Sequence, residues 1–140
     1  MISQSGCVLL ENDAIEIMVQ QLFPLASLIT PNLQEAAWIL QRDTIVESEM
    51  PDIAASMASR YKTSILLKGG HLTGNVCNDY LFDYTTQQGR WFNHDKIDSE
   101  NCHGTGCTLA SAIAANLAKQ HPLPTAIALA VEYLQKALLQ

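Results

Sequence analysis

Residues 63–70 read TSILLKGG, and this stretch decides the predicted fold class. Its apolar residues are consecutive, as in a strand buried on both faces of a parallel sheet, and the run ends in a lysine and two glycines. A second run of strand formers, ASLIT at residues 26–30, precedes Pro31, and helices are expected between the two runs at residues 32–40 and 47–61. The order strand, helix, helix, strand predicts an α/β protein with a mostly parallel sheet, in which both strands are central.

The elements outside this centre complete the predicted organisation. An amphipathic helix is expected at residues 12–23, and two strands joined by a polar, glycine-containing turn at residues 78–93 are expected to form a hairpin at a sheet edge. Two flanking helices close the chain at residues 107–119 and 123–139. Because no linker, repeat or low-complexity stretch interrupts these elements, we predict one domain over residues 1–140.

The composition excludes several classes of function. The chain has 140 residues and a formal net charge of −6, and its eight lysines and arginines form no run, so we expect no nucleic-acid partner. No apolar run approaches the roughly 20 residues of a spanning helix, and the first residues do not form a secretion signal, so we expect a cytoplasmic protein without a membrane partner. The four cysteines are irregularly spaced and lack a C-x-x-C pair, which favours reduced thiols over disulfides or a zinc site.

A glycine-rich bend precedes the first of the two closing helices. Residues 103–108 read HGTGCT, and the helix after them carries no charge up to residue 118. Gly104 and Gly106 allow backbone N–H groups to approach a ligand, and the positive end of the helix dipole favours an anion such as phosphate. The same field favours Cys107 as a thiolate or a hydrogen-bond partner. The alternative interpretation is a turn that starts a core helix, with Cys107 as a small buried apolar residue.

Three other polar motifs lie at or near the predicted strands. Asn32 and Glu35 in TPNLQEA lie on the first turn of a predicted helix, where they can organise Mg²⁺ through water or, alternatively, form a capping box. Lys68 in LLKGGH can neutralise phosphate charge at the carboxyl end of a parallel strand, or it is a surface lysine beside a turn. Asp79 and Asp83 in DYLFD share one side of a strand, and we expect them to face solvent.

Together these motifs resemble those of a known family. The order T-P-N-x-x-E-A, K-G-G-H, H-G-T-G-C-T is similar to that of the ribokinase-like superfamily of small-molecule kinases, and most closely to its phosphomethylpyrimidine kinases of thiamine biosynthesis. The similar blocks FPLASLITPNLQEA, ILLKGGHLTG, DYLFD and NCHGTGCTLASAIAANLAK extend over nearly the whole chain. Most superfamily members have an aspartate where this chain has Cys107, whereas the hydroxymethylpyrimidine group has a cysteine there.

The resemblance implies an activity, cofactors and site residues. The implied reaction is the ATP- and Mg²⁺-dependent phosphorylation of 4-amino-5-hydroxymethyl-2-methylpyrimidine phosphate to its diphosphate, and in many members also of the unphosphorylated alcohol. The bend before the closing helices is the implied anion hole, with Cys107 in the place of the catalytic base, and Glu35 is the implied metal-organising residue. The implied catalytic residues are Gly104, Thr105, Gly106 and Cys107, and the implied nucleotide-binding residues are Asn32, Lys68, Gly70 and Asp79.

The resemblance also implies a ribokinase-like three-layer sandwich, of which this chain is the C-terminal half. Complete relatives are nearly twice as long, and their N-terminal half supplies most of the pyrimidine pocket and several strands. We therefore expect a homodimer or association with the missing half, because either would cover unpaired sheet edges. Two function classes stay open, a phosphomethylpyrimidine kinase and a nucleotide-binding or regulatory remnant without turnover. A pyridoxal-type kinase is a third interpretation, disfavoured by Cys107.

Overall fold

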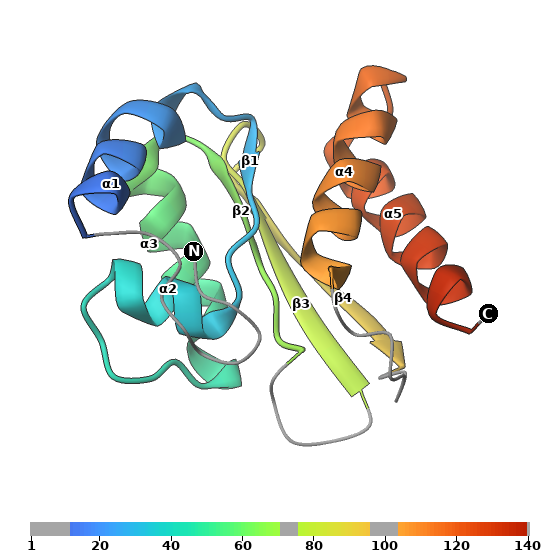
Figure 1. Cartoon of the computed structure of the whole chain (residues 1–140), viewed down its shortest axis with the longest axis horizontal. Helices are drawn as coiled ribbons and strands as arrows, with labels where there is room; N and C mark the ends of the chain where they lie inside the picture. Colours follow the sequence, from blue (N-terminus) through green and yellow to red (C-terminus); the bar gives the residue numbers. More distant parts are fainter. Residues whose placement is uncertain (1–11, 71–75, 96–103, 140) are drawn as a thin grey trace. The chain divides into compact units, whose positions relative to one another are not determined.

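The computed structural model describes residues 12–70, 76–95 and 104–139, and these form an α/β fold with a four-stranded sheet (Figure 1). The expected α/β class is confirmed. Within the described ranges, no helix is long and apolar enough to cross a membrane. The described residues fall into two compact units, one of residues 12–70 and 77–93 and the other of residues 76, 94–95 and 104–139. The strand-end motifs belong to the first unit and the glycine-rich bend to the second.

The helical segments of the first unit follow the predicted ranges to within one or two residues. In chain order they are α1 (Asn12–Ile17), a π-helical turn η1 (Met18–Leu22), a 3₁₀ turn η2 (Phe23–Leu25), α2 (Leu33–Ile39), a 3₁₀ turn η3 (Glu47–Glu49) and α3 (Met50–Tyr61). Pro51 occupies the first turn of α3, where its missing N–H has no intrahelical acceptor to lose. The first unit therefore contains the predicted helices. The helix predicted at residues 12–23 ends in a π-helical turn followed by a 3₁₀ turn.

The sheet is mixed rather than mostly parallel. Its strands are β1 (Leu28–Ile29), β2 (Ser64–Leu67), β3 (Val76–Asp83) and β4 (Gln88–Asp95), in that spatial order. β2 pairs in parallel with β1 and antiparallel with β3, so the expected predominance of parallel pairing is not met by the described strands. Only residues 68–75 join β2 to β3. A parallel connection needs a crossover of about a dozen residues or more, so β3 must run back alongside β2.

The positions of the strands in the sheet confirm two predictions and correct a third. The β3–β4 hairpin lies at one end of the strand order, as expected for an edge hairpin. All four residues of β2 are buried, which confirms a central strand. β1 is half-buried and stands at the other end of the order, so among the described strands it is not central.

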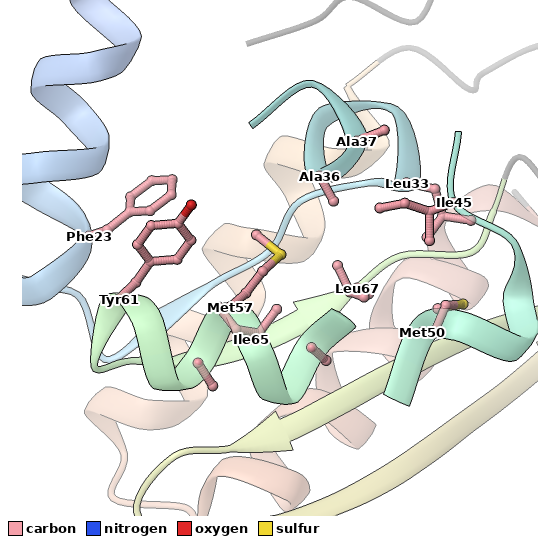
Figure 2. Packing of buried hydrophobic residues seen from close by; sticks show 12 residues of the cluster. Phe23, Leu33, Ala36, Ala37, Ile45, Met50, Met57, Tyr61, Ile65 and Leu67 are labelled. Carbon is pink, nitrogen blue, oxygen red and sulfur yellow. The ribbon is translucent and has the colours of Figure 1, made fainter. Parts of the chain in front are cut away.

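The core of the first unit lies between the sheet and the helices on one of its faces (Figure 1). Ile65 and Leu67 of β2 are fully buried and point toward Met57 of α3 (Figure 2). At the far end of α3, the Tyr61 ring meets the Phe23 ring edge to face at 5.3 Å between centroids. Burial of each large apolar side chain contributes about 1.5 to 3 kcal/mol, so this core fixes β2 and the motif at its end.

The second unit contains two antiparallel helices, α4 (Thr105–Ala118) and α5 (Leu123–Leu138), joined by residues 119–122 (Figure 1). α4 begins two residues before the predicted start, and α5 ends one residue before the predicted end. Glu132 and Lys136 form the i,i+4 ion pair that their spacing indicates, at 2.5 Å. Because both side chains are exposed, this pair contributes little to stability.

Candidate active site

The two strand-end motifs meet at the edge of the sheet that is formed by the carboxyl ends of β1 and β2. Lys68 N donates a hydrogen bond to Pro31 O at 3.0 Å, and Asn32 and Lys68 form a parallel bridge just beyond β1 and β2. Parallel strands bring their carboxyl ends to the same edge, where ligands bind in open α/β sheets. Asn32 and Lys68 are both half-buried. The edge therefore holds an amide and a lysine on adjacent strand ends.

Asn32 and Glu35 form a capping box at the start of α2. Asn32 Oδ1 accepts a hydrogen bond from Glu35 N at 2.7 Å, and Asn32 N donates to Glu35 Oε2 at 3.0 Å. The capping interpretation of this motif is thus confirmed. The same bonds hold the half-buried Glu35 carboxylate beside the end of β1, so the cap also fixes where an acidic oxygen lies at this edge.

A buried aspartate holds the turn that follows Lys68. Gly69 N donates to Asp79 Oδ1 at 2.8 Å, and Asp79 is only 4% exposed. Asp83, at 8% exposed, accepts from Thr85 N at 2.9 Å in the hairpin turn. The two carboxylates share one face of β3, as predicted. The prediction that they face solvent is wrong, because backbone N–H groups of two turns satisfy them inside the fold.

Gly70 is the second glycine of the lysine motif and is half-buried. A Cβ added at Gly70 would come within 4.0 Å of Cys77 Sγ, an ordinary contact distance. Packing against Cys77 therefore does not require a glycine at this position. His71, the last residue of the motif, lies outside the described residues, as do His103, Cys7 and Cys102.

The glycine-rich bend opens α4 through a left-handed residue. Gly104 has φ 83° and ψ 2°, a conformation that residues with a Cβ rarely adopt, and no atom of the described residues lies within 4 Å of where its Cβ would be. Thr108 N donates to Gly104 O at 2.9 Å, which is the first bond of the helix. The N–H groups of Thr105, Gly106 and Cys107 precede this bond and have no intrahelical acceptor. Gly104 has no side chain to cap them, and amides in this position at a helix N-terminus can bind an anion.

The bend is open to solvent rather than enclosed in the core. Gly104 and Cys107 are exposed, and Thr105 and Gly106 are half-buried. The alternative interpretation of Cys107 as a buried apolar residue is therefore wrong. The thiol lies at the first turn of a 14-residue helix and is exposed.

A groove begins at Cys107 and follows α4 and α5. It has a volume of about 810 Å³, and both helices line it. Its walls include Ser111, Ala115 and Asn116 of α4 and Tyr133 of α5. Sequence reasoning did not find this groove. The small, uncharged residues of α4 were the available signal.

The predicted site residues form two groups, one in each unit. The first unit brings together Asn32, Glu35, Lys68, Gly70 and Asp79 around the ends of β1 and β2. The second unit brings together the four residues of the bend, Gly104, Thr105, Gly106 and Cys107. Each group has the chemistry expected of a phosphate site, a lysine in one and helix-terminal amides in the other.

The acidic side chains of the first unit bear on whether magnesium can bind there. Among the described residues, no three or more His, Cys, Asp or Glu side chains cluster as a metal site. Mg²⁺ in nucleotide-dependent enzymes commonly keeps several waters and takes one or two carboxylates together with substrate phosphates. The Glu35 carboxylate fits that mode of binding.

The fold is that of the ribokinase-like class of kinases, as its likeness to two solved structures shows. The pyridoxal kinase of Staphylococcus aureus in complex with AMP-PCP and pyridoxal superposes with a TM-score of 0.83 at 28% identity, over 94% of this chain and 49% of that chain. The phosphomethylpyrimidine kinase of Clostridium difficile 630 superposes with a TM-score of 0.78 at 31% identity, over 98% of this chain and 54% of that one. The ribokinase-like fold expected from the sequence is thereby confirmed.

The chain belongs to the phosphomethylpyrimidine kinase family, whose pattern matches residues 1–140. The hydroxymethylpyrimidine/phosphomethylpyrimidine kinase of Rhizobium meliloti is 41% identical over 99% of this chain and 52% of its own length. The chain therefore spans about half the length of the curated relative it matches.

Proposed function

We propose that this chain carries the ATP-phosphate and phosphoryl-transfer half of a kinase that converts 4-amino-5-hydroxymethyl-2-methylpyrimidine phosphate to its diphosphate. Membership of the phosphomethylpyrimidine kinase family supports the reaction class. The observation that carries the proposal is the bend before α4, where Gly104 turns the chain and an exposed Cys107 lies among the first amides of the helix. A nucleotide is supported by the AMP-PCP bound to the related pyridoxal kinase.

Different residues of the chain bind the phosphates, stabilise their charge and orient the metal ion. The N–H groups of Thr105, Gly106 and Cys107 donate to the oxygens of the transferring phosphoryl group, where negative charge develops. Lys68 neutralises charge on the ATP phosphates, and Glu35, held by its capping box, orients hydrated Mg²⁺. Mg²⁺, when bound there, would supply positive charge that offsets the negative charge of the ATP phosphates.

The reaction makes modest demands on a base. An oxygen of the acceptor phosphate forms a bond to the γ-phosphorus of ATP, the bond from that phosphorus to the bridging oxygen breaks, and ADP leaves. The acceptor is a phosphate monoester with a second pKa of about 6, so at neutral pH its attacking oxygen is already largely deprotonated. Phosphorylation of the alcohol differs, because its proton must be taken up, and Cys107 is the proposed acceptor of that proton.

The direct test is an assay of the purified 140-residue chain. With ATP, Mg²⁺ and the pyrimidine phosphate, we expect the self-associated chain to release ADP in a reaction that depends on the pyrimidine and is lost in Lys68→Ala. Lys68→Ala is a suitable control because Lys68 is half-buried at a strand end and contributes little to the core. Equal ADP release by the two proteins would contradict the proposal.

Two other functions remain distinguishable in the same assay. The chain spans about half the length of its relatives, and a catalytically silent nucleotide-binding or regulatory remnant is the second candidate. It would bind ADP without releasing ADP from ATP. A pyridoxal-type kinase is favoured by the likeness to the pyridoxal kinase of Staphylococcus aureus. It would use pyridoxal in preference to the pyrimidine.

We further propose that the pyrimidine is recognised by residues outside the two groups of this chain. The relatives are about twice as long, and β1 stands at one end of the described strand order, where another strand can pair with it. A second copy of the chain or a further polypeptide is the proposed partner. Light scattering of the purified chain tests self-association, and a well-folded monomer would exclude the homodimer.

A further inference from the structure

We infer that Asp79 is a positioning residue, which fixes Lys68 for its contact with nucleotide phosphate and does not itself touch the nucleotide. The inference rests on the proposed function, because it assigns a purpose to a contact within the proposed phosphate site. Its basis is the bond from Gly69 N to Asp79 Oδ1 at 2.8 Å.

The Asp79 side chain forms a hydrogen bond to the backbone at the point where the β2–β3 ladder ends. The antiparallel register pairs Leu66 with Leu81 and Leu67 with Tyr80, so the next pair would be Lys68 and Asp79. At that point the backbone pairing of β2 and β3 is no longer part of the ladder. The carboxylate of Asp79 instead accepts the N–H of Gly69. A side chain from β3 thus holds the peptide that follows Lys68.

The backbone of Lys68 is held from both sides. On the β1 side, Lys68 N donates to Pro31 O at 3.0 Å, and Asn32 bridges to Lys68. On the β3 side, Asp79 holds the next amide. These two attachments fix the backbone from which the lysine side chain projects. Because this backbone is already fixed, less conformational entropy is lost when the flexible lysine side chain binds a phosphate.

The burial of Asp79 separates this role from that of a ligand. At 4% exposed, its carboxylate faces the turn rather than a solvent-filled site. A charged carboxylate that faced nucleotide phosphates would also repel them. The backbone N–H of Gly69 is a favourable partner, since a charge-assisted bond to a buried amide is stronger than a neutral one.

The test is a double-mutant cycle on ADP affinity, measured by calorimetry with Mg²⁺ on the full 140-residue chain. Asp79→Ala and Lys68→Ala are each expected to weaken ADP binding by about tenfold. The double variant is expected to be no weaker than the poorer single variant, because the position of Lys68 is irrelevant once its side chain is gone. Asp79→Asn keeps an oxygen acceptor for Gly69 and is expected to restore most of the affinity.

Asp83→Ala is the matched control. It removes a second buried carboxylate from the same face of β3, at the hairpin turn instead of the Lys68 turn. We expect a comparable fall in the midpoint of thermal unfolding, with ADP affinity within about twofold of the unsubstituted chain. Equal losses of ADP affinity in Asp79→Ala and Asp83→Ala would overturn the inference, as would additive losses in the cycle or a failure of Asp79→Asn to restore binding.

The cycle also separates this inference from the proposed function. If the unsubstituted chain does not bind ADP, or if Lys68→Ala binds it equally well, the proposed function fails and Asp79 has no lysine to position. If Lys68→Ala weakens binding and Asp79→Ala does not, the proposed function stands and the inference alone is overturned.

Discussion

Replacement of Gly104 by alanine tests the geometry of the bend most sharply. Gly104 has φ 83°, and a non-glycine residue in this region pays roughly 1 to 2 kcal/mol. Alanine also restricts the unfolded chain, which returns about 0.4 to 1 kcal/mol. Among the described residues, no atom lies within 4 Å of the added Cβ, so no clash with them adds to the penalty. The expected net loss of unfolding free energy is about 1 kcal/mol.

The matched control is Gly104→Asn, because asparagine tolerates the left-handed region better than alanine does. Urea unfolding followed by circular dichroism should give a smaller loss for Gly104→Asn than for Gly104→Ala. In calorimetry with AMP-PCP, which carries a γ-phosphate, both variants should bind more weakly, since both place a side chain beside the amides of Thr105 and Gly106. Equal losses of stability for the two variants, or none for Gly104→Ala, would refute the assigned backbone conformation.

Three further predictions concern other parts of the chain. Cys107→Ser should slow phosphorylation of the pyrimidine alcohol more than that of its phosphate, since only the alcohol needs a base; equal losses in initial rate would contradict this. Asn32→Ala should lower the unfolding free energy in urea by about 1 kcal/mol through loss of the capping box, and an unchanged midpoint would refute that role. Tyr61→Phe should leave the free energy of unfolding unchanged or raise it, because among the described residues the buried Tyr61 hydroxyl has no hydrogen-bond partner. Burial also raises the pKa of Tyr61, so the stability of the unsubstituted chain should fall as pH rises above about 10, and that of Tyr61→Phe should fall less steeply. Identical slopes in pH-dependent unfolding would argue against this.

The sign of the Tyr61 effect follows from proton binding. With its pKa raised, the folded state holds the phenolic proton more tightly than the unfolded state does. The resulting stabilisation is complete below the unfolded pKa and disappears as pH rises through the folded one.

The central strand and the helices of the fold could be predicted from local patterns. The consecutive apolar residues of β2 indicated a strand buried on both faces, and all of them are buried. The direction of β3 was missed, because hydropathy carries no information about direction. The short connection of residues 68–75 carried that information, since it is too short for a crossover.

The candidate site was predictable where a motif is local and was not where it depends on distant partners. Asn32 and Glu35 are three residues apart, so their capping box could be weighed from spacing alone. The burial of Asp79 could not be predicted in this way, because a carboxylate is buried only where a hydrogen-bond donor satisfies it. That donor is the N–H of Gly69, ten positions earlier in the chain. The exposure of Cys107 likewise depends on how the bend projects from α4.

The most direct test of the account is an NMR titration of the ¹⁵N-labelled 140-residue chain with AMP-PCP and Mg²⁺, with adenosine as the control. The account predicts large amide shifts at Thr105, Gly106 and Cys107 and at Gly69 beside Lys68 with AMP-PCP, and none of comparable size with adenosine. AMP-PCP binding that leaves the amides of the α4 bend unshifted would contradict the claim that they hold the phosphoryl group.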